Sequence, residues 1–277
     1  MKLLNQPFFS VIIPACNCEK YIIDAIQSVE KQTYQDWEII IIEDHSNDDT
    51  YAIISDYIQS KNKIKLLQTS SNSGSPGLPR DIGVTSARGK FIGFLDGDDI
   101  YHPEKLQLHF NTINANPSIE IIHTAYNIVS PNKQFIKYRK QPFFQKIYSF
   151  LFKTKTACLL TNPFCLSTVI IKKELISQYK FALVPTLFSA VEDWFLWNRI
   201  FYDRIPVIYY NKTALLDYRW IETSISGRDI HRCELQAVVF FSFLFRNGQI
   251  HIIEWFLATF IRLVRIFFKK FFGYEVI

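Results

Sequence analysis

Three short runs of apolar residues are the clearest pattern in the chain, at positions 11–13, 39–42 and 91–95. Most of their residues are β-branched or aromatic, and none of the runs alternates with polar positions. Buried parallel strands have this pattern because both of their faces are covered. We therefore predict that the three runs are central strands of a sheet, with residues 64–67 as a further strand.

Helical patterns separate the predicted strands. Residues 22–29 carry an apolar stripe at helical spacing, and residues 50–58 carry another. Asn17 is placed to cap the first of these helices. The four predicted strands begin 28, 25 and 27 residues apart, which matches the spacing of strand–helix–strand units. Residues 1–110 are therefore predicted to form an open, mostly parallel α/β sheet with flanking helices.

The composition of the 277 residues indicates a globular protein with an apolar, basic tail. Apolar residues make up 48% and aromatic residues 16%, which excludes a disordered or linker-like chain. The net charge is +5, and residues 240–277 supply +3 of it with five Lys or Arg against two Asp or Glu. The remaining +2 is too small to attract a polyanion, so we expect no nucleic-acid partner.

The cysteines and the amino terminus indicate a cytoplasmic protein. Five cysteines form no CxxC pair, and an odd number without a framework is typical of reduced thiols. The amino terminus lacks the continuous apolar stretch of a signal peptide. No window of about 18 uncharged apolar residues occurs, so we expect no membrane-spanning helix.

Three segments follow the predicted strands, at residues 14–17, 43–49 and 96–99, and the last two are rich in carboxylates. The carboxyl ends of parallel strands meet at one edge of a sheet, where such folds bind ligands. The third segment reads Asp-Gly-Asp-Asp, and a helix cap would need only one of these carboxylates. Two carboxylates separated by a glycine suit a divalent cation that keeps open positions for substrate phosphates. The sequence therefore predicts a metal–diphosphate site.

Seven segments, taken in order, resemble the inverting family 2 glycosyltransferases of the bacterial surface-polysaccharide type. The resemblance extends over residues 8–226, which is 219 of the 277 residues. It implies the GT-A fold, a Rossmann-like α/β fold, and a divalent cofactor, Mn²⁺ or Mg²⁺. The segments that carry it are residues 10–17, 28–34, 38–46, 77–83, 94–99, 192–197, and 218–219 with 224–226.

The resemblance implies which residues hold the nucleotide sugar. Asp44 would accept a hydrogen bond from the base, and Arg80 would lie near the diphosphate. Asp96 would contact the ribose or the metal, and Asp98 would ligate the metal that bridges the diphosphate. Cys16 stands where the family commonly has a tyrosine that can stack on the base. The full set of expected nucleotide-sugar-binding residues is Pro14, Ala15, Cys16, Asn17, Glu43, Asp44, Arg80, Asp96, Gly97 and Arg219.

Glu192 and Asp193 are the candidate catalytic residues. From the residues alone, this pair either starts a helix or carries chemistry, and a helix N-terminus would also hold an acidic group rigidly. The resemblance favours catalysis, with Asp193 as the general base that deprotonates the acceptor hydroxyl. A like-charged neighbour raises the pKa of one member of such a pair, which helps a base. Arg219 either binds the diphosphate or the acceptor, or pairs with a carboxylate.

The carboxyl-terminal tail has the pattern of an amphipathic helix. Residues 255–272 contain four basic residues and no acidic ones. Arg262, Arg265, Lys269 and Lys270 fall on one helical face, and phenylalanines occupy much of the other. Such a helix either lies in a membrane interface or packs on the core with its basic face in water, and we favour the interface. We therefore expect a peripheral protein on the inner face of the cell membrane.

These observations predict a glycosyltransferase with three segments. Residues 1–110 would form the nucleotide-sugar-binding half of one domain, and residues 111–226 would form its acceptor-binding half. Residues 227–277 would form a helical membrane-associating region. The enzyme would move one sugar, with inversion, from a nucleotide diphosphate sugar, UDP being favoured, to a glycan or lipid-linked acceptor in cell-surface polysaccharide or lipopolysaccharide biosynthesis. A sugar-1-phosphate nucleotidyltransferase is the first alternative, but it should carry a Gly-rich basic loop at residues 14–17. A non-catalytic scaffold subunit is the second alternative, and the intact acidic motifs argue against it.

Overall fold

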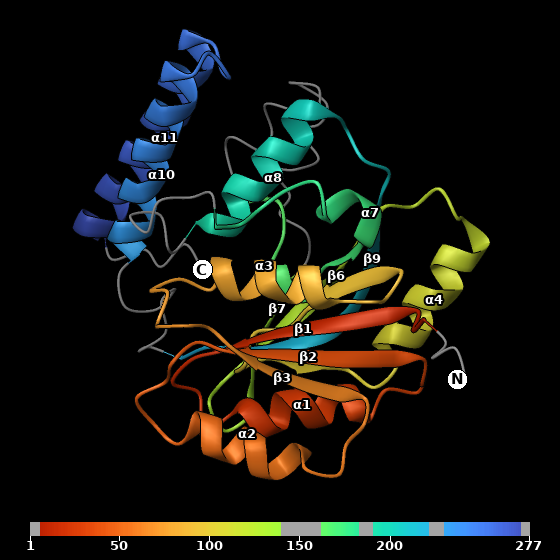
Figure 1. The fold of residues 1–277 in the computed structure, drawn as a ribbon. Helices are drawn as coiled ribbons and strands as arrows, with labels where there is room; N and C mark the ends of the chain where they lie inside the picture. The colour runs from red at the N-terminus through yellow and green to blue at the C-terminus, as the bar shows by residue number, and fades with distance from the viewer. Residues whose placement is uncertain (1–5, 140–161, 183–190, 222–229, 273–277) are drawn as a thin grey trace.

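One mixed sheet runs through the protein in the computed structural model (Figure 1). The structure describes residues 6–139, 162–182, 191–221 and 230–272. Four parallel strands form one side of the sheet in the order β3-β2-β1-β4, which confirms the strands predicted from the apolar runs. Their bounds are Phe9–Ala15 for β1, Trp37–Glu43 for β2, Ile64–Gln68 for β3 and Phe91–Phe94 for β4.

The remaining strands extend this sheet beyond β4. β8 (Ile170–Lys172) pairs antiparallel with β4, and β6 (Ile121–Val129) pairs antiparallel with β8. β9 (Ile208–Arg219) runs parallel to β6, while β5 (Ile100–Tyr101) and β7 (Phe135–Arg139) pair antiparallel with β9 and β6. Strands from both predicted halves of the domain therefore share one layer.

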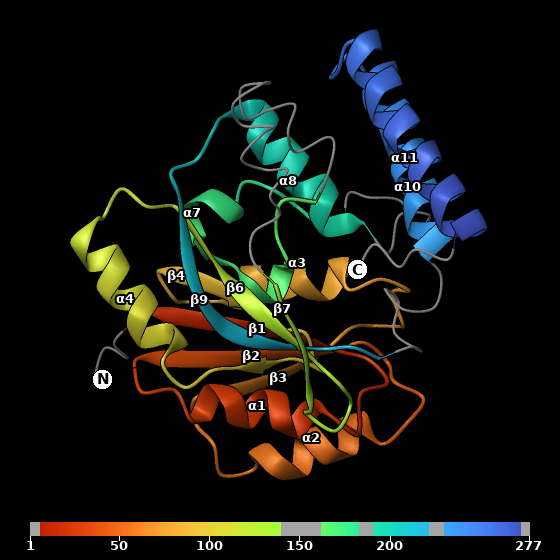
Figure 2. The ribbon, with the colours of Figure 1, turned by 180° about the vertical axis from the view of Figure 1, so that it is seen from behind.

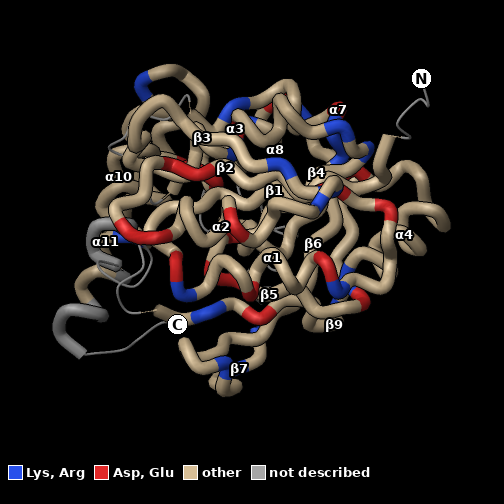
Figure 3. Tube along the Cα trace, turned by 60° about the horizontal axis from the view of Figure 1, so that its bottom comes forward, with Lys and Arg blue, Asp and Glu red and all other residues tan. Residues whose placement is uncertain are grey.

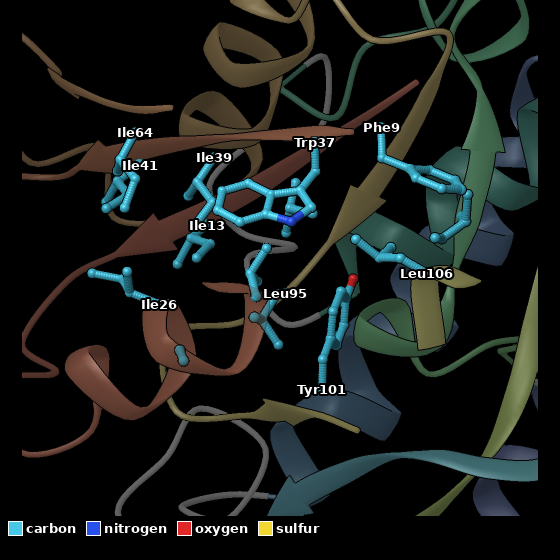
Figure 4. Packing of buried hydrophobic residues seen from close by; sticks show 14 of the residues in the cluster. Phe9, Ile13, Ile26, Trp37, Ile39, Ile41, Ile64, Leu95, Tyr101 and Leu106 are labelled. Carbon is cyan, nitrogen blue, oxygen red and sulfur yellow. The ribbon is translucent and has the colours of Figure 1, made fainter. Parts of the chain in front are cut away.

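Helices cover both faces of the parallel strands, which explains the uninterrupted apolar runs (Figure 2). Val11 and Ile13 of β1 join one buried cluster, and Ile12 between them joins the other. Figure 4 shows the first cluster, where Ile13 and Ile39 of the sheet lie near Ile26. Full burial of one such side chain contributes about 1.5–3 kcal/mol. The first cluster includes α1 (Ile22–Glu30), α2 (Thr50–Ile58) and α4 (Lys105–Ala115), and the second includes α3 (Gly77–Ser86), α7 (Lys173–Ile176), α8 (Glu192–Asp203) and the short 3-10 helix η1 (Leu166–Thr168).

The beginning of α1 differs from the sequence prediction. α1 begins at Ile22 after Tyr21, and no side chain caps it. Asn17 instead lies in the preceding loop with a φ of 51°, a left-handed conformation that asparagine tolerates better than most residues. Its Oδ1 accepts a hydrogen bond from the backbone N–H of Asn47 at 2.8 Å. The prediction of Asn17 as a helix cap is therefore wrong, and the residue braces the loops after β1 and β2.

Two carboxyl-terminal helices lie side by side against α8 (Figures 1 and 2). α10 (Ile230–Arg246) and α11 (Ile252–Phe272) share a buried cluster with the first turn of α8. Arg262 is only 4% exposed, and its guanidinium carbon lies 4.5 Å from the centre of the Trp194 ring. The expectation that Arg262 lies on an open basic face is therefore wrong. Among the described helices, none is long and apolar enough to cross a membrane.

Charged positions are interspersed along the chain trace in Figure 3. In this view neither sign gathers on one side of the molecule, which agrees with the small net charge outside the tail. The acidic residues of the predicted site therefore stand out through their place at strand ends, not through a general acidic surface.

Candidate active site

The loops that follow β1 and β4 meet at the carboxyl edge of the sheet. The chain passes from β1 outward to β2 and β3 and then returns to β4 on the other side of β1, so these two strands flank the switch point where such sheets bind ligands. Gly97 lies directly against the first loop. A Cβ added to Gly97 would stand 3.0 Å from the Cys18 Sγ and 3.4 Å from the Pro14 carbonyl oxygen. The acidic loop and residues 14–17 are therefore in contact, as the sequence predicts.

The carboxylates after β2 organise the neighbouring loops. Glu43 is fully buried and accepts hydrogen bonds from the backbone N–H of Ser46 at 2.6 Å and from Gln68 Nε2 at 2.8 Å. Burial alone would raise the pKa of Glu43, but these bonds outweigh it and hold the pKa below its ordinary value. Asp44 accepts bonds from Thr69 Oγ1 at 2.8 Å and from Ser73 Oγ at 2.7 Å. The contact of Glu43 and Asp44 with the nucleotide base stays a prediction. The same holds for Cys16, which is exposed.

The acidic loop holds three carboxyl groups, those of Asp96, Asp98 and Asp99. Asp96 is partly exposed, and burial, together with the charge of Asp96, raises the pKa of Asp98 to about 6. Asp99 is buried, and its Oδ2 has no hydrogen-bond partner among the described residues. Asp96 and Asp98 would be two ligands of a divalent cation, which would take its other ligands from substrate phosphates and water. Within the described part of the chain, no three His, Cys, Asp or Glu side chains are grouped to hold a metal by themselves.

Arg80 joins the acidic loop to Glu192, the neighbour of the candidate general base Asp193. Its Nη2 lies 2.8 Å from the Asp96 Oδ1, and its Nη1 lies 2.5 Å from the Glu192 Oε1. The residue is 4% exposed. In the structure the guanidinium is thus held between two carboxylates, and its expected contact with phosphate stays a prediction.

Glu192 and Asp193 form the first turn of α8 and differ in their surroundings. Glu192 is buried and paired with Arg80, whereas Asp193 is only half-buried. Burial raises the pKa of Glu192 to about 7, with Arg80 opposing the rise and Asp193 adding to it. Burial also raises the pKa of Asp193, while a 2.8 Å hydrogen bond from Asn162 Nδ2 to its Oδ2 opposes that shift. Asp193 is thus the more exposed of the two carboxyl groups, and its raised pKa suits a general base, a role that stays a prediction.

Arg219 lies behind the acidic loop. Its guanidinium pairs with Asp24 Oδ2 at 3.0 Å and stacks 4.4 Å from the centre of the Tyr21 ring. Its backbone N–H donates to Asp99 Oδ1 at 3.0 Å. The side chain is 2% exposed and pairs with Asp24 of α1. Of the roles that the sequence left open for Arg219, the structure has the pairing with a carboxylate.

Two residues of the site escape sequence reasoning. Asn162 orients the candidate base, but it lies in a stretch without a recognisable motif and 31 residues before Asp193. Asp99 belongs to the acidic segment, but nothing in the sequence shows that it is buried and bound to the backbone of Arg219. Both roles arise from tertiary contacts.

Comparison with known proteins decides the family. Residues 10–176 match the model of glycosyl transferase family 2. The chain belongs to this family. It is 30% identical over 235 residues to the UDP-Glc:alpha-D-GlcNAc-diphosphoundecaprenol beta-1,3-glucosyltransferase WfgD of Escherichia coli, an alignment that covers 84% of this chain and 85% of that protein. The family 2 assignment confirms the predicted glycosyltransferase and disfavours both alternatives.

Another relative is the poly(ribitol-phosphate) beta-N-acetylglucosaminyltransferase TarS of Staphylococcus aureus. It is 39% identical over 101 residues, which are 36% of this chain and 18% of TarS. The crystal structure of TarS residues 1–349 with UDP-GlcNAc superposes with a TM-score of 0.65 at 22% identity, covering 95% of this chain and 73% of that one. This likeness confirms the predicted GT-A fold. Family 2 members commonly use a divalent metal, which agrees with the acidic loop.

Proposed function

We propose that this family 2 glycosyltransferase transfers one sugar from a UDP-sugar to a lipid-linked glycan acceptor, with inversion, in bacterial surface-polysaccharide synthesis. The observation on which this proposal rests is that Arg80 bonds both Asp96 and Glu192. These bonds bring the acidic loop and the Glu192–Asp193 pair into one site. The printed activity of WfgD supports a UDP-sugar donor and a diphosphoundecaprenol-linked acceptor. The structures of TarS with UDP and UDP-GlcNAc support the same class of donor.

The chemistry follows from the placement of the carboxylates. Asp193 accepts the proton of the acceptor hydroxyl while that oxygen bonds to the anomeric carbon. The bond from this carbon to the diphosphate oxygen breaks on the opposite face, so the configuration inverts and UDP leaves. Asp96 and Asp98 would hold Mn²⁺ or Mg²⁺, whose charge offsets the charge on the departing diphosphate. Asn162 keeps the Asp193 carboxylate oriented through its 2.8 Å hydrogen bond.

A panel of nucleotide sugars tests the donor. The full chain is incubated with UDP-, GDP-, dTDP- and CMP-sugars and Mn²⁺, and release of the nucleotide product is measured with and without a diphosphoundecaprenol-linked acceptor. We expect acceptor-dependent release of UDP. Release of pyrophosphate from a sugar-1-phosphate and a nucleoside triphosphate, with no acceptor-dependent transfer, would contradict the proposal.

We also propose that the helix pair α10–α11 rests on the inner face of the cell membrane. The support is an exposed apolar face on α11 whose members recur every three or four residues, as one side of a helix does. The exposed fractions of its large side chains run from 51% to 76%. A lipid-linked acceptor would be presented at such a surface. The face consists of Ile253, Phe256, Phe260, Leu263 and Phe267.

Point substitutions test the membrane contact better than truncation does. Ala258 of α11 is 1% exposed in the cluster shared with α8, so deletion of this helix would disrupt the base region as well. We expect the double substitution Phe256→Ser, Phe260→Ser to weaken co-sedimentation with anionic vesicles by roughly 10-fold or more, because two half-exposed rings lose their lipid contact. Phe135→Ser on β7 is the matched control, since Phe135 is 64% exposed. Equal sedimentation of the double variant and the control would contradict the proposal.

A further inference from the structure

Arg80 bonds residues of both the donor side and the acceptor side of the site. It bonds Asp96, 16 positions away in the donor-side loop, and Glu192, 112 positions away in the acceptor-side helix. The side chain is 5% exposed. A phosphate-binding arginine would be expected to keep part of its guanidinium open to the ligand. Here both terminal nitrogens already hold a carboxylate.

α3 holds Arg80 firmly in this place. Gly83, one turn further along α3, packs so closely on the sheet that an added Cβ would stand 2.4 Å from the Ile12 Cγ2. Asp81, the neighbour of Arg80, accepts the backbone N–H groups of Phe181 and Ala182 at 2.9 and 2.8 Å. The two adjacent residues therefore connect α3 to residues 181–182 and to Glu192.

We propose that Arg80 is a positioning residue that couples donor binding at Asp96 to the alignment of the Glu192–Asp193 pair, an inference that rests on the proposed function. When both carboxyl groups are ionised, Arg80, Asp96 and Glu192 together carry one net negative charge. When Glu192 is neutralised, Arg80 pairs with Asp96 alone and offsets the whole charge of that carboxylate. A cation that arrives with the donor is then attracted less strongly by Asp96. Binding on the donor side therefore depends on a residue of the acceptor side, and by linkage the reverse holds.

The test is the affinity of the full chain for UDP in Mn²⁺, measured by titration calorimetry. We expect Glu192→Gln to weaken UDP binding by about 10-fold, within the usual range of coupling between sites. Asp193→Asn is the matched control, because it removes the neighbouring charge without touching the bond to Arg80, and we expect a change of about 2-fold or less. Thermal unfolding of each variant checks that the fold is kept.

A second variant isolates the bridge. Arg80→Lys keeps the charge but loses the planar fork that bonds two carboxylates at once. In that background the Glu192→Gln change should alter UDP affinity by about 2-fold or less, because the coupling is gone. The same cycle should show the coupling in the acceptor KM as well, which a purely structural role of Arg80 would not produce.

Three results would overturn the inference. Tighter UDP binding by Glu192→Gln would mean that the released guanidinium binds phosphate, so Arg80 would be a donor ligand. Equal losses in Glu192→Gln and Asp193→Asn would reduce the effect to general electrostatics. Absence of UDP binding by the unsubstituted chain would contradict the proposed function itself, and with it the basis of the coupling.

Discussion

Gly97 provides a sharp test of the contact between the acidic loop and the loop after β1. The substitution Gly97→Ala would place a methyl group 3.0 Å from the Cys18 Sγ. Favourable contacts between such atoms lie at about 3.5–4.0 Å, so the Cys18 side chain and the loop that carries it must give way by a few tenths of an ångström or more. Where the loop gives way, Asp96 and Asp98 move away from residues 14–17. We therefore expect weaker donor binding with little change in the remainder of the fold.

The size of the effect follows from overpacking. Extra methyl groups in well-packed regions destabilise by about 1–3 kcal/mol. If the donor requires the close arrangement of the two loops, this energy appears as a loss of UDP affinity of roughly 5- to 150-fold. The contact with the Pro14 carbonyl oxygen, at 3.4 Å, is close to ordinary van der Waals distance and adds little. Most of the effect is thus assigned to Cys18.

A double variant provides the control. Cys18→Ala removes the sulfur that the new methyl group would meet, so Cys18→Ala with Gly97→Ala should recover most of the UDP affinity. The assay is calorimetric titration of UDP in Mn²⁺ for the single and double variants. An unchanged affinity in Gly97→Ala, or a double variant as weak as the single one, would refute the loop contact as the cause.

Two further substitutions test the surroundings of the base. Asn162→Ala removes the 2.8 Å hydrogen bond that lowers the pKa of Asp193, so the acid limb of the kcat/KM profile should move to higher pH, and an unshifted limb would count against Asp193 as the titrating base. Arg262→Leu removes the buried guanidinium from the Trp194 ring and should destabilise by about 1–2 kcal/mol, seen as a lower Tm. Arg246→Leu, at an exposed position of α10, should leave Tm unchanged, and equal shifts would argue against the Trp194 contact.

The parallel half of the fold was readable from the sequence because its strands are covered on both faces. Ile12 and Ile13 are both 0% exposed although they point to opposite sides, which produces an uninterrupted apolar run. β9 lacks such a signal, since many of its 12 residues are exposed or half-buried. Its place beside β6 depends on pairing between residues nearly 90 positions apart, such as Ile121 with Ile208.

The site was predictable where chemistry sits in one short segment, and not where distant residues meet. The acidic loop can be recognised from the sequence because three carboxylates fall within four positions, 96–99. The bond of Arg80 to Glu192 has no local signal, because 112 positions separate the two. Arg262 shows a related limit. A helical pattern places it on the basic side of α11, but which side of the helix faces the protein depends on the shared cluster with Trp194.

Sugar transfer in this site depends, as proposed, on Asp193 as the general base. The most direct measurement is turnover of Asp193→Asn against Asp56→Asn, a control at an exposed position of α2, with the UDP-sugar and acceptor selected in the panel and Mn²⁺ present. We expect Asp193→Asn to lose two or more orders of magnitude in kcat while still binding UDP, because general bases typically contribute about 10²–10⁴-fold. Asp56→Asn should match the unsubstituted chain. Near-normal turnover of Asp193→Asn would contradict the account.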